Sequence, residues 1–451
     1  MKYKYKSLFI FLLLISLISI SSCNANKKVE KSETNRKEIT IYILCSKVAS
    51  RYSFALGSYD GVQVNPVYFD DNLEKLQNRL NLELMVGEGP DVVCTTDDRT
   101  TDIVKSVYKL ASSNTLIDLN PFMNADKKYK EADYNKIIMN SGIYNAKRFF
   151  IPRLYAVPAL ITTKEKLDVN DINISGNRWS WEDFLNTCKN FMITRKDKRQ
   201  ALIFDYEGKL LIDLIANSKT QFIDYSSKVT KFNTRDFISL LKDYKDYIYP
   251  VTMTDTESNE NALLADDNLA VMRNIQETGD PLTYMALDGY LGMMDGNANQ
   301  DQKNSEAYIL PSYGNGDIYG LPREMFGITS RCKYKQAAYD FIQNLVKSTN
   351  INIGHSPIAG VAVYKPLFNL SLEAAAGKVP LTDIGMHPNR ALNGNEKIFF
   401  GIVPEVSDFR MNDETVNEMI TSSVDKYIKG SITAEQAANE IDRKAKLFLN
   451  E

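Results

Sequence analysis

The fold follows most directly from one stretch, GEGPDVVCTTDDR at residues 87–99. Leucines recur at helical spacing over residues 73–84, and the glycines and proline at 87–90 end that predicted helix. Residues 91–94 then read as a short, buried strand. Such a strand suits a parallel sheet covered on both faces, in which ligands lie beyond the carboxyl ends of the strands. We therefore expect residues 95–99 at the mouth of a crevice, although a solvated polar loop has the same composition.

Strands and helices alternate on both sides of this stretch. Apolar, β-branched runs at residues 39–45 and 62–69 predict two further strands, and the alternation indicates an α/β fold with a doubly wound, mainly parallel sheet. Pro66 places the second of these strands towards an edge. Later segments are mostly helical, with helices expected at 102–112, 182–192, 210–216, 234–247, 261–267, 336–346, 413–428 and 434–449.

The length of the chain indicates two lobes. Its 451 residues exceed one typical hydrophobic core. Three extended segments, at residues 149–155, 308–311 and 360–364, are the expected crossings between the lobes.

The first 22 residues read as an export signal. Three lysines precede an apolar run over residues 8–20, which is too short to span a bilayer comfortably. The ISSC motif at residues 20–23 resembles the bacterial lipobox, whose cysteine receives a diacylglyceryl group. This predicts lipidation at Cys23, whereas the alternative is a plain cleaved signal with an incidental cysteine. Residues 24–37 are polar and charged, so we expect them to form a flexible tether.

Composition argues against several classes of function. The formal net charge is −3 and no basic stripe is present, so we expect no nucleic-acid partner. Only His355 and His387 could serve a histidine-based triad, and the sequence has no nucleophile elbow, zinc-protease motif or phosphate loop. Paired carboxylates could still hydrolyse glycosidic bonds, so a glycoside-processing enzyme stays an alternative.

Two further patterns concern metals and thiols. Residues 295–306 supply five ligand positions of a twelve-residue calcium loop, but Gln300 stands where that loop requires glycine. An ordinary polar loop is favoured, and no metal or cofactor is predicted. Cys45 and Cys94 both end predicted strands, and a pair of buried thiols is favoured over a disulfide.

An ordered set of motifs resembles the extracellular solute-binding proteins of the maltose-binding type. The motifs are ISSC at 20–23, GPDVV at 89–93, LNPFM at 119–123, IP at 151–152, WSWE at 179–182, AAYDFI at 337–342 and the paired C-terminal helices. The resemblance implies a two-lobe periplasmic-binding-protein fold with three crossings. It divides the chain into a signal peptide (1–22), a lipidated tether (23–37), an N-terminal lobe (38–153 plus 312–359) and a C-terminal lobe (154–311 plus 360–451).

The resemblance also implies ligand-binding positions. Lys47 falls where a family lysine reaches sugar hydroxyls, and Asp98 with Arg99 matches an aspartate–arginine pair that binds sugar. A carboxylate beside a guanidinium suits a polyol, since each hydroxyl can donate to one and accept from the other. Arg99 could equally pair with Asp97 or Asp102 as part of the structure.

Other expected positions depart from the family pattern or rest on location alone. Thr95 stands where maltose-binding members have a stacking tryptophan, and polar Gln276 and Glu277 lie near another aromatic position. Phe409 lies in a segment that lines the cleft in the family, although core packing suits it equally. The remaining candidates, Arg153 and Tyr155, lie beside the first crossing.

These observations predict the substrate-binding component of an ABC transporter. It would be a monomer held by its lipid on the extracytoplasmic face of the membrane, and it would deliver a solute, by family analogy a sugar or oligosaccharide, to a permease. The alternatives are the envelope enzyme above and a lipoprotein that senses or scaffolds without transport.

Overall fold

The computed structural model describes most of the chain beyond residue 36. The described residues are 37–44, 55–70, 72–96, 102–163, 167–168, 171–174, 178–195, 201–205, 209–254, 305–348, 361–375, 378 and 403–451. Internal contacts divide the chain into two units, Met1–Glu38 and Ile39–Glu451.

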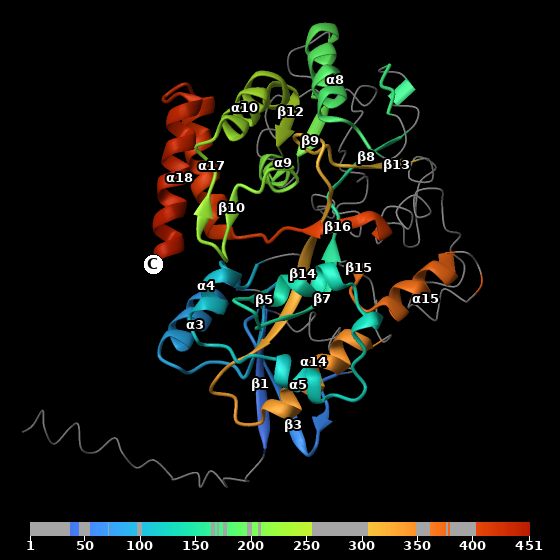
Figure 1. Ribbon diagram of the computed structural model, residues 1–451, viewed down its shortest axis with the longest axis vertical. Helices are drawn as coiled ribbons and strands as arrows, with labels where there is room; N and C mark the ends of the chain where they lie inside the picture. Colours follow the sequence, from blue (N-terminus) through green and yellow to red (C-terminus); the bar gives the residue numbers. More distant parts are fainter. Residues whose placement is uncertain are drawn as a thin grey trace, which may run out of the picture. The chain divides into compact units, whose positions relative to one another are not determined.

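A large mixed sheet forms the centre of one half of this unit (Figure 1). Among the described residues its order is β15-β7-β14-β4-β1-β3-β2, with β16 also paired to β14. The strands are β1 (Glu38–Ile43), β2 (Ser58–Tyr59), β3 (Val62–Tyr68), β4 (Val92–Cys94), β7 (Ile151–Ala156), β14 (Ile318–Ile328), β15 (Val361–Ala362) and β16 (Val406–Phe409). β1 and β4 are parallel, whereas β14 runs antiparallel to both β4 and β7.

The opening stretch folds largely as predicted. Helix α3 (Leu73–Met85) leads to Gly87 and Gly89, both with positive φ, and then to β4. The next helix, α4 (Val107–Ser112), starts later than the predicted residue 102, because the side chain of Ser106 accepts the Lys109 N–H as its N-cap. Residues 102–106 instead lead from an isolated β-bridge between Thr96 and Asp102 to that helix.

Residues beyond 157 build a second, more helical region. β8 (Ala159–Thr163) pairs antiparallel with β13 (Ser305–Ile309), and β9 (Ile203–Asp205) pairs parallel with β12 (Thr252–Thr254). Its other elements are α8 (Trp181–Thr194), α9 (Leu210–Ala216), β10 (Ile223–Asp224), β11 (Val229–Thr230), α10 (Arg235–Asp243), α17 (Glu414–Ile428) and α18 (Ala434–Asn450). The predicted helices in this region are confirmed, except that residues 261–267 lie outside the described part.

Shorter elements and one long helix complete the sheet half. They are α5 (Asn120–Ala125), α6 (Lys136–Met139), β5 (Ile143–Tyr144), β6 (Lys147–Arg148), α14 (Lys335–Lys347) and α15 (Lys365–Ala375). None of the helices in the described part has both the length and the apolar character needed to cross a bilayer.

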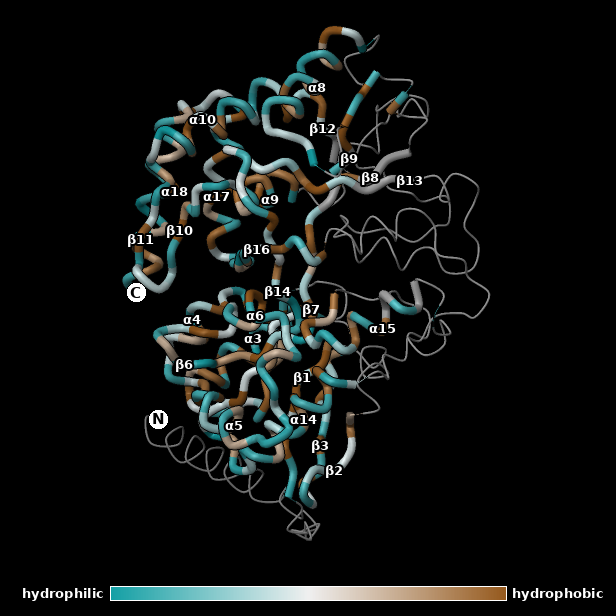
Figure 2. The backbone as a smooth tube through the Cα atoms, turned by 45° about the vertical axis from the view of Figure 1, so that its right-hand side comes forward, coloured by the Kyte–Doolittle hydropathy of each residue, from teal (hydrophilic) through white to brown (hydrophobic). Residues whose placement is uncertain are grey.

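The buried apolar residues form separate cores. Ile39, Ile41 and Ile43 of β1 belong to a core on the α14 side of the sheet, whereas Tyr42 and Leu44 belong to a core on the α3 and α4 side. This alternation confirms a sheet covered on both faces. A helical core contains α8, α9, α10, α17 and α18. Hydrophobic residues along β1 and α9 are visible in Figure 2.

Candidate functional site

A cavity of about 280 Å³ lies between the core on the α3 and α4 side of the sheet and the helical core. The sheet half contributes the residues after β4, one face of α4 and β5. The helical half contributes α9, β10 and the start of α17. Residues 321–323 of β14 and residues 408–412 complete the wall. Because both halves line the same cavity, a molecule bound there would contact both.

The two threonines of the opening stretch hold strand β14 in place. The hydroxyl of Thr96 accepts the N–H of Glu324 at 2.8 Å, and the hydroxyl of Thr95 accepts the N–H of Met325 at 3.1 Å. Thr95 is 2 % exposed, and Thr96 lines the cavity. The structure therefore places Thr95 just beneath the cavity wall and Thr96 in it.

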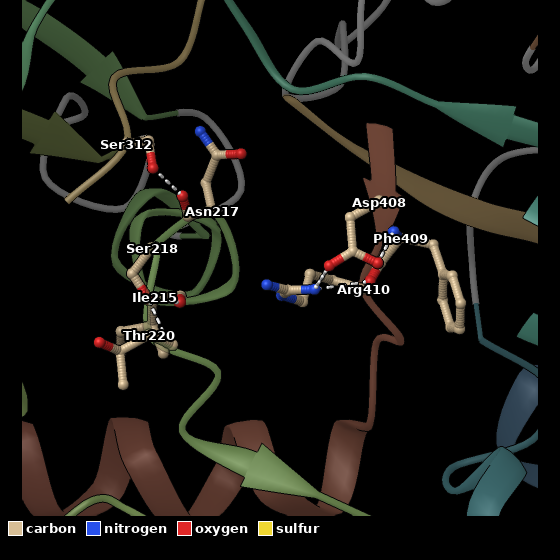
Figure 3. A network of polar contacts seen from close by, with 8 residues as sticks. All are labelled: Ile215, Asn217, Ser218, Thr220, Ser312, Asp408, Phe409 and Arg410. Carbon is tan, nitrogen blue, oxygen red and sulfur yellow. Dashed lines mark hydrogen bonds and ion pairs between the residues drawn. The ribbon is translucent and has the colours of Figure 1, made fainter. Parts of the chain in front are cut away.

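Phe409 lies in the cavity wall and also packs against the α14-side core. Its neighbour Arg410 donates to the carboxylate of Asp408 at 2.6 Å and lies 3.7 Å from the ring centroid of Tyr319. Figure 3 shows Arg410 and the carboxylate of Asp408 facing each other, while the ring of Phe409 points away from them. The sequence left ligand contact and core packing open for Phe409, and the structure shows the core packing and places the residue in the cavity wall.

The same close view shows how the C-terminal end of α9 is held (Figure 3). The Ser218 hydroxyl donates to the Ile215 carbonyl at 2.7 Å, and the Ser312 hydroxyl donates to the Asn217 carbonyl. These bonds add side-chain donors to carbonyl groups at the end of the helix. They fix the α9 face that lines the cavity.

Arg153 and Tyr155 lie in the sheet rather than in the cavity wall. Arg153 forms an ion pair with Glu324, and its Nε donates to the Leu345 carbonyl at 3.1 Å. Tyr155 is 2 % exposed, and burial raises the pKa of its hydroxyl. Neither belongs to the described residues that line the cavity. Both positions face the packed α14 side, which sequence position alone could not reveal.

Several expected site residues lie outside the described part of the chain. They are Lys47, Asp98, Arg99, Gln276 and Glu277, together with Cys23, Cys45 and residues 295–304 of the possible calcium loop. The residues on either side of 97–101 are nevertheless described. Thr96 and Asp102 form an antiparallel bridge, and both line the cavity.

Two carboxylates at the cavity have perturbed acidity. Burial raises the pKa of Asp102 to about 6, opposed by the positive charges of Lys209 and Arg323. Burial also raises the pKa of Asp413 to about 6, opposed by its hydrogen bond from Ser106. Both groups would therefore gain protons in mildly acidic conditions. Within the described residues no cluster of three or more His, Cys, Asp or Glu side chains could hold a metal ion.

Sequence reasoning missed the cationic residues of the wall, Lys209, Arg323 and Arg410. Arg323 sits in LPREMF, a segment whose proline and charged residues hide its strand. Only the pairing of β14 with β4 and β7 places it at the cavity.

Comparison with known proteins settles the fold. No family model matches the chain, and no curated protein matches it either. Solved structures do. The ABC substrate-binding protein Lmo0181 from Listeria monocytogenes, in complex with cycloalternan, has a TM-score of 0.62 at 14 % identity over 92 % of this chain and 99 % of its own.

The chain has the two-lobe periplasmic-binding-protein fold. The sugar-binding protein MalE from Xanthomonas citri has a TM-score of 0.65 at 12 % identity, over 92 % of this chain and 97 % of its own. A putative oligosaccharide periplasmic-binding protein from Synechococcus has a TM-score of 0.65 at 13 % identity. The match covers 91 % of this chain and 99 % of that protein. The two-lobe fold expected from the sequence is therefore confirmed, and in it the cavity lies between the sheet half and the helical half.

Proposed function

We propose that this protein is the substrate-binding component of an ABC importer and captures a sugar or oligosaccharide in the cavity. The observation that carries the proposal is a cavity lined from both halves of a two-lobe fold. A ligand that contacts both lobes stabilises the closed arrangement over the open one by its differential affinity. Such closure can present the solute to a permease.

The similar structures support a carbohydrate ligand. One is described in complex with cycloalternan, another as a sugar-binding protein, and a third, from Thermotoga lettingae, as bound with α-D-tagatose. The cavity suits such a ligand because its wall combines aromatic rings, among them Tyr108, Tyr144 and Phe409, with charged and hydroxyl groups. Rings cover the apolar faces of a sugar, and polar groups bind its hydroxyls.

The ligand contacts that we propose combine the expected residues with the described wall. Asp98 and Arg99 fall between Thr96 and Asp102 in the sequence, and these two residues form a bridge and line the cavity. Phe409 supplies an aromatic face. Lys47, Gln276 and Glu277 stay candidates, whereas Arg153, Tyr155 and Thr95 act by holding the wall.

The sequence places the lobe divisions at residues 153/154 and 311/312, whereas we propose that they lie near 157/158 and 317/318. Tyr155, Val157 and Ile318 belong to the α14-side core, and Tyr313 packs against the helical core. Residues 361–363 and 403–406 join the N-terminal lobe, because their valines pack into the α14-side core. Helices α17 and α18, whose buried residues belong to the helical core, are part of the helical lobe.

We propose the location of the protein and its membrane partners from the export signal expected at residues 1–22 and from Cys23. Lipidation at Cys23 would hold the monomeric protein on the extracytoplasmic face of the membrane, beside its permease. Two acyl chains on one cysteine suffice for stable anchoring, whereas one does not. A sensory or scaffolding lipoprotein would share this location but would need no importer.

A thermal-shift screen tests the function. Mono- and oligosaccharides form one panel, and amino acids, peptides and polyamines form the opposing panel, because a bound ligand raises the melting temperature by mass action. A saccharide hit that is recovered unchanged after long incubation supports a binding protein. A hydrolysed product would favour the glycoside-processing enzyme, and hits only in the opposing panel would contradict a sugar receptor.

A further inference from the structure

Arg323 is a cationic group of the cavity wall whose charge interacts with that of Asp102, but whose Nε–H has no hydrogen-bond acceptor in the described part of the chain. It lies on β14, where the strand passes the cavity. Its Nε is buried and makes no hydrogen bond with any described residue. A buried, unpaired guanidinium N–H is costly, so its position calls for an acceptor.

The aspartates nearby already have donors. Asp408 accepts from Arg410 at 2.6 Å, Asp102 from Asn412 at 2.6 Å and Asp413 from Ser106 at 2.6 Å. Asp224 accepts the backbone N–H groups of Ser226 and Ser227. None of these four carboxylates accepts a hydrogen bond from the Arg323 Nε in the structure, although Asp102 is close enough for the two charges to attract.

A buried ion pair holds the backbone that carries Arg323. Arg153 and Glu324 lie opposite each other on β7 and β14 and pair beneath α14, with side chains 5 % and 1 % exposed. Glu324 has a φ of 44°, which is strained for a residue with a side chain. Its N–H is bound by Thr96. Glu324 is thus fixed on the α14 side, while its neighbour Arg323 lines the cavity.

We propose that Arg323 binds an anionic group of the solute, so that the preferred ligand is a saccharide carrying a carboxylate or a phosphate. Arg153 and Glu324 are positioning residues for this contact. The proposal rests on the proposed sugar-binding function and narrows its substrate class. A guanidinium matches a carboxylate or phosphate with two parallel hydrogen bonds, which a single neutral hydroxyl cannot offer.

Matched sugars test the proposal by titration calorimetry on the purified protein. Glucuronate is compared with glucose and with glucuronamide, its neutral counterpart, and galacturonate is compared with galactose. Glucose 6-phosphate distinguishes a phosphate from a carboxylate. We expect an acidic sugar to bind at least tenfold more tightly than its neutral counterpart.

Variants assign the preference to Arg323. Arg323→Gln is expected to lose at least tenfold in affinity for the acidic sugar and to change the affinity for the neutral sugar far less. Arg323→Lys, which keeps the charge, should recover part of the loss. Arg235→Gln removes an exposed arginine of α10 and is the matched control.

The ratio of the affinity for the acidic sugar to the affinity for the neutral sugar tests the positioning residues Arg153 and Glu324. Glu324→Gln should lower this ratio even if the variant melts at a lower temperature, because a purely structural loss would weaken both sugars alike. Equal affinity for neutral and acidic sugars, or an unchanged ratio in Arg323→Gln, overturns the inference while the sugar-binding function stands. If no sugar binds at all, the proposed function fails and the inference fails with it.

Discussion

The hydroxyl of Ser106 donates to the carboxylate of Asp413 at 2.6 Å, and each residue is the N-cap of a helix. Ser106 caps α4 beside the sheet, and Asp413 caps α17 in the helical core. A backbone bond from the Glu414 N–H to the Lys105 carbonyl, at 2.9 Å, strengthens the same junction. The two halves therefore meet at the edge of the cavity through one buried carboxylate, which is 3 % exposed.

Asp413→Asn should reduce the pH dependence of stability. Burial raises the pKa of Asp413 from its ordinary value of 3.8 to about 6, so the folded protein binds more protons than the unfolded chain between these values. The free energy of unfolding therefore falls as pH rises through this window, by about 3 kcal/mol from this group. Asparagine still caps a helix but does not titrate.

Urea unfolding at pH 4, 5, 6 and 7 measures this effect. The difference in unfolding free energy between Asp413→Asn and the unaltered protein should move in favour of the variant from pH 4 to pH 6 and then level off. A difference that stays constant with pH would mean that Asp413 titrates near its ordinary pKa.

Arg153 and Glu324 should be strongly coupled. Arg153→Met leaves the Glu324 carboxylate buried without its cation, which costs about 3 to 5 kcal/mol. Adding Glu324→Gln removes the orphaned charge and should restore part of that loss. A double-mutant cycle from urea unfolding gives the coupling energy. If the two single substitutions change the free energy of unfolding additively, the pair contributes no mutual stabilisation.

Gly142→Ala should destabilise the cavity wall. A Cβ at this position would lie 1.9 Å from the carbonyl oxygen of Phe150, and backbone cannot move aside cheaply. We expect a loss of at least about 1 to 3 kcal/mol in unfolding free energy. Gly57→Ala is the matched control, because nothing lies within 4 Å of its Cβ position. Equal melting temperatures for the two variants would contradict the close approach.

Cys23→Ser tests the anchor. If Cys23 carries the lipid, the unaltered protein should label with radioactive palmitate and sediment with membranes, and the variant should do neither. Cys188→Ser is a suitable control, since that thiol is buried in the helical core. Membrane association and labelling that persist in Cys23→Ser would exclude lipidation at this residue.

The sequence predicted helices and strands well where a local residue pattern marks them. The leucine spacing of α3 and the apolar run of β4 carry their own information. The start of α4 was misplaced because Asp102, another residue suited to capping, precedes Ser106. Local chemistry alone does not choose between two such caps.

Long-range pairing explains what the sequence could not reveal. β14 contains Gly320, Pro322 and Gly327, which weaken any strand prediction, and its length comes from pairing with distant strands. Arg153 looked like a cleft residue by position. Its partner Glu324 lies 171 positions away, so only the fold shows that the two charges are buried together.

A calorimetric titration of Ala216→Trp tests the central claim most directly. Ala216 ends α9 and lines the cavity, so an indole there would occupy the space in which we place the sugar. The titrant is the saccharide with the largest thermal shift, and Ala132→Trp, at an exposed position, is the control. We predict that Ala216→Trp folds but loses at least tenfold in affinity while Ala132→Trp does not. Unchanged affinity in a folded Ala216→Trp variant would contradict the cavity as the binding site.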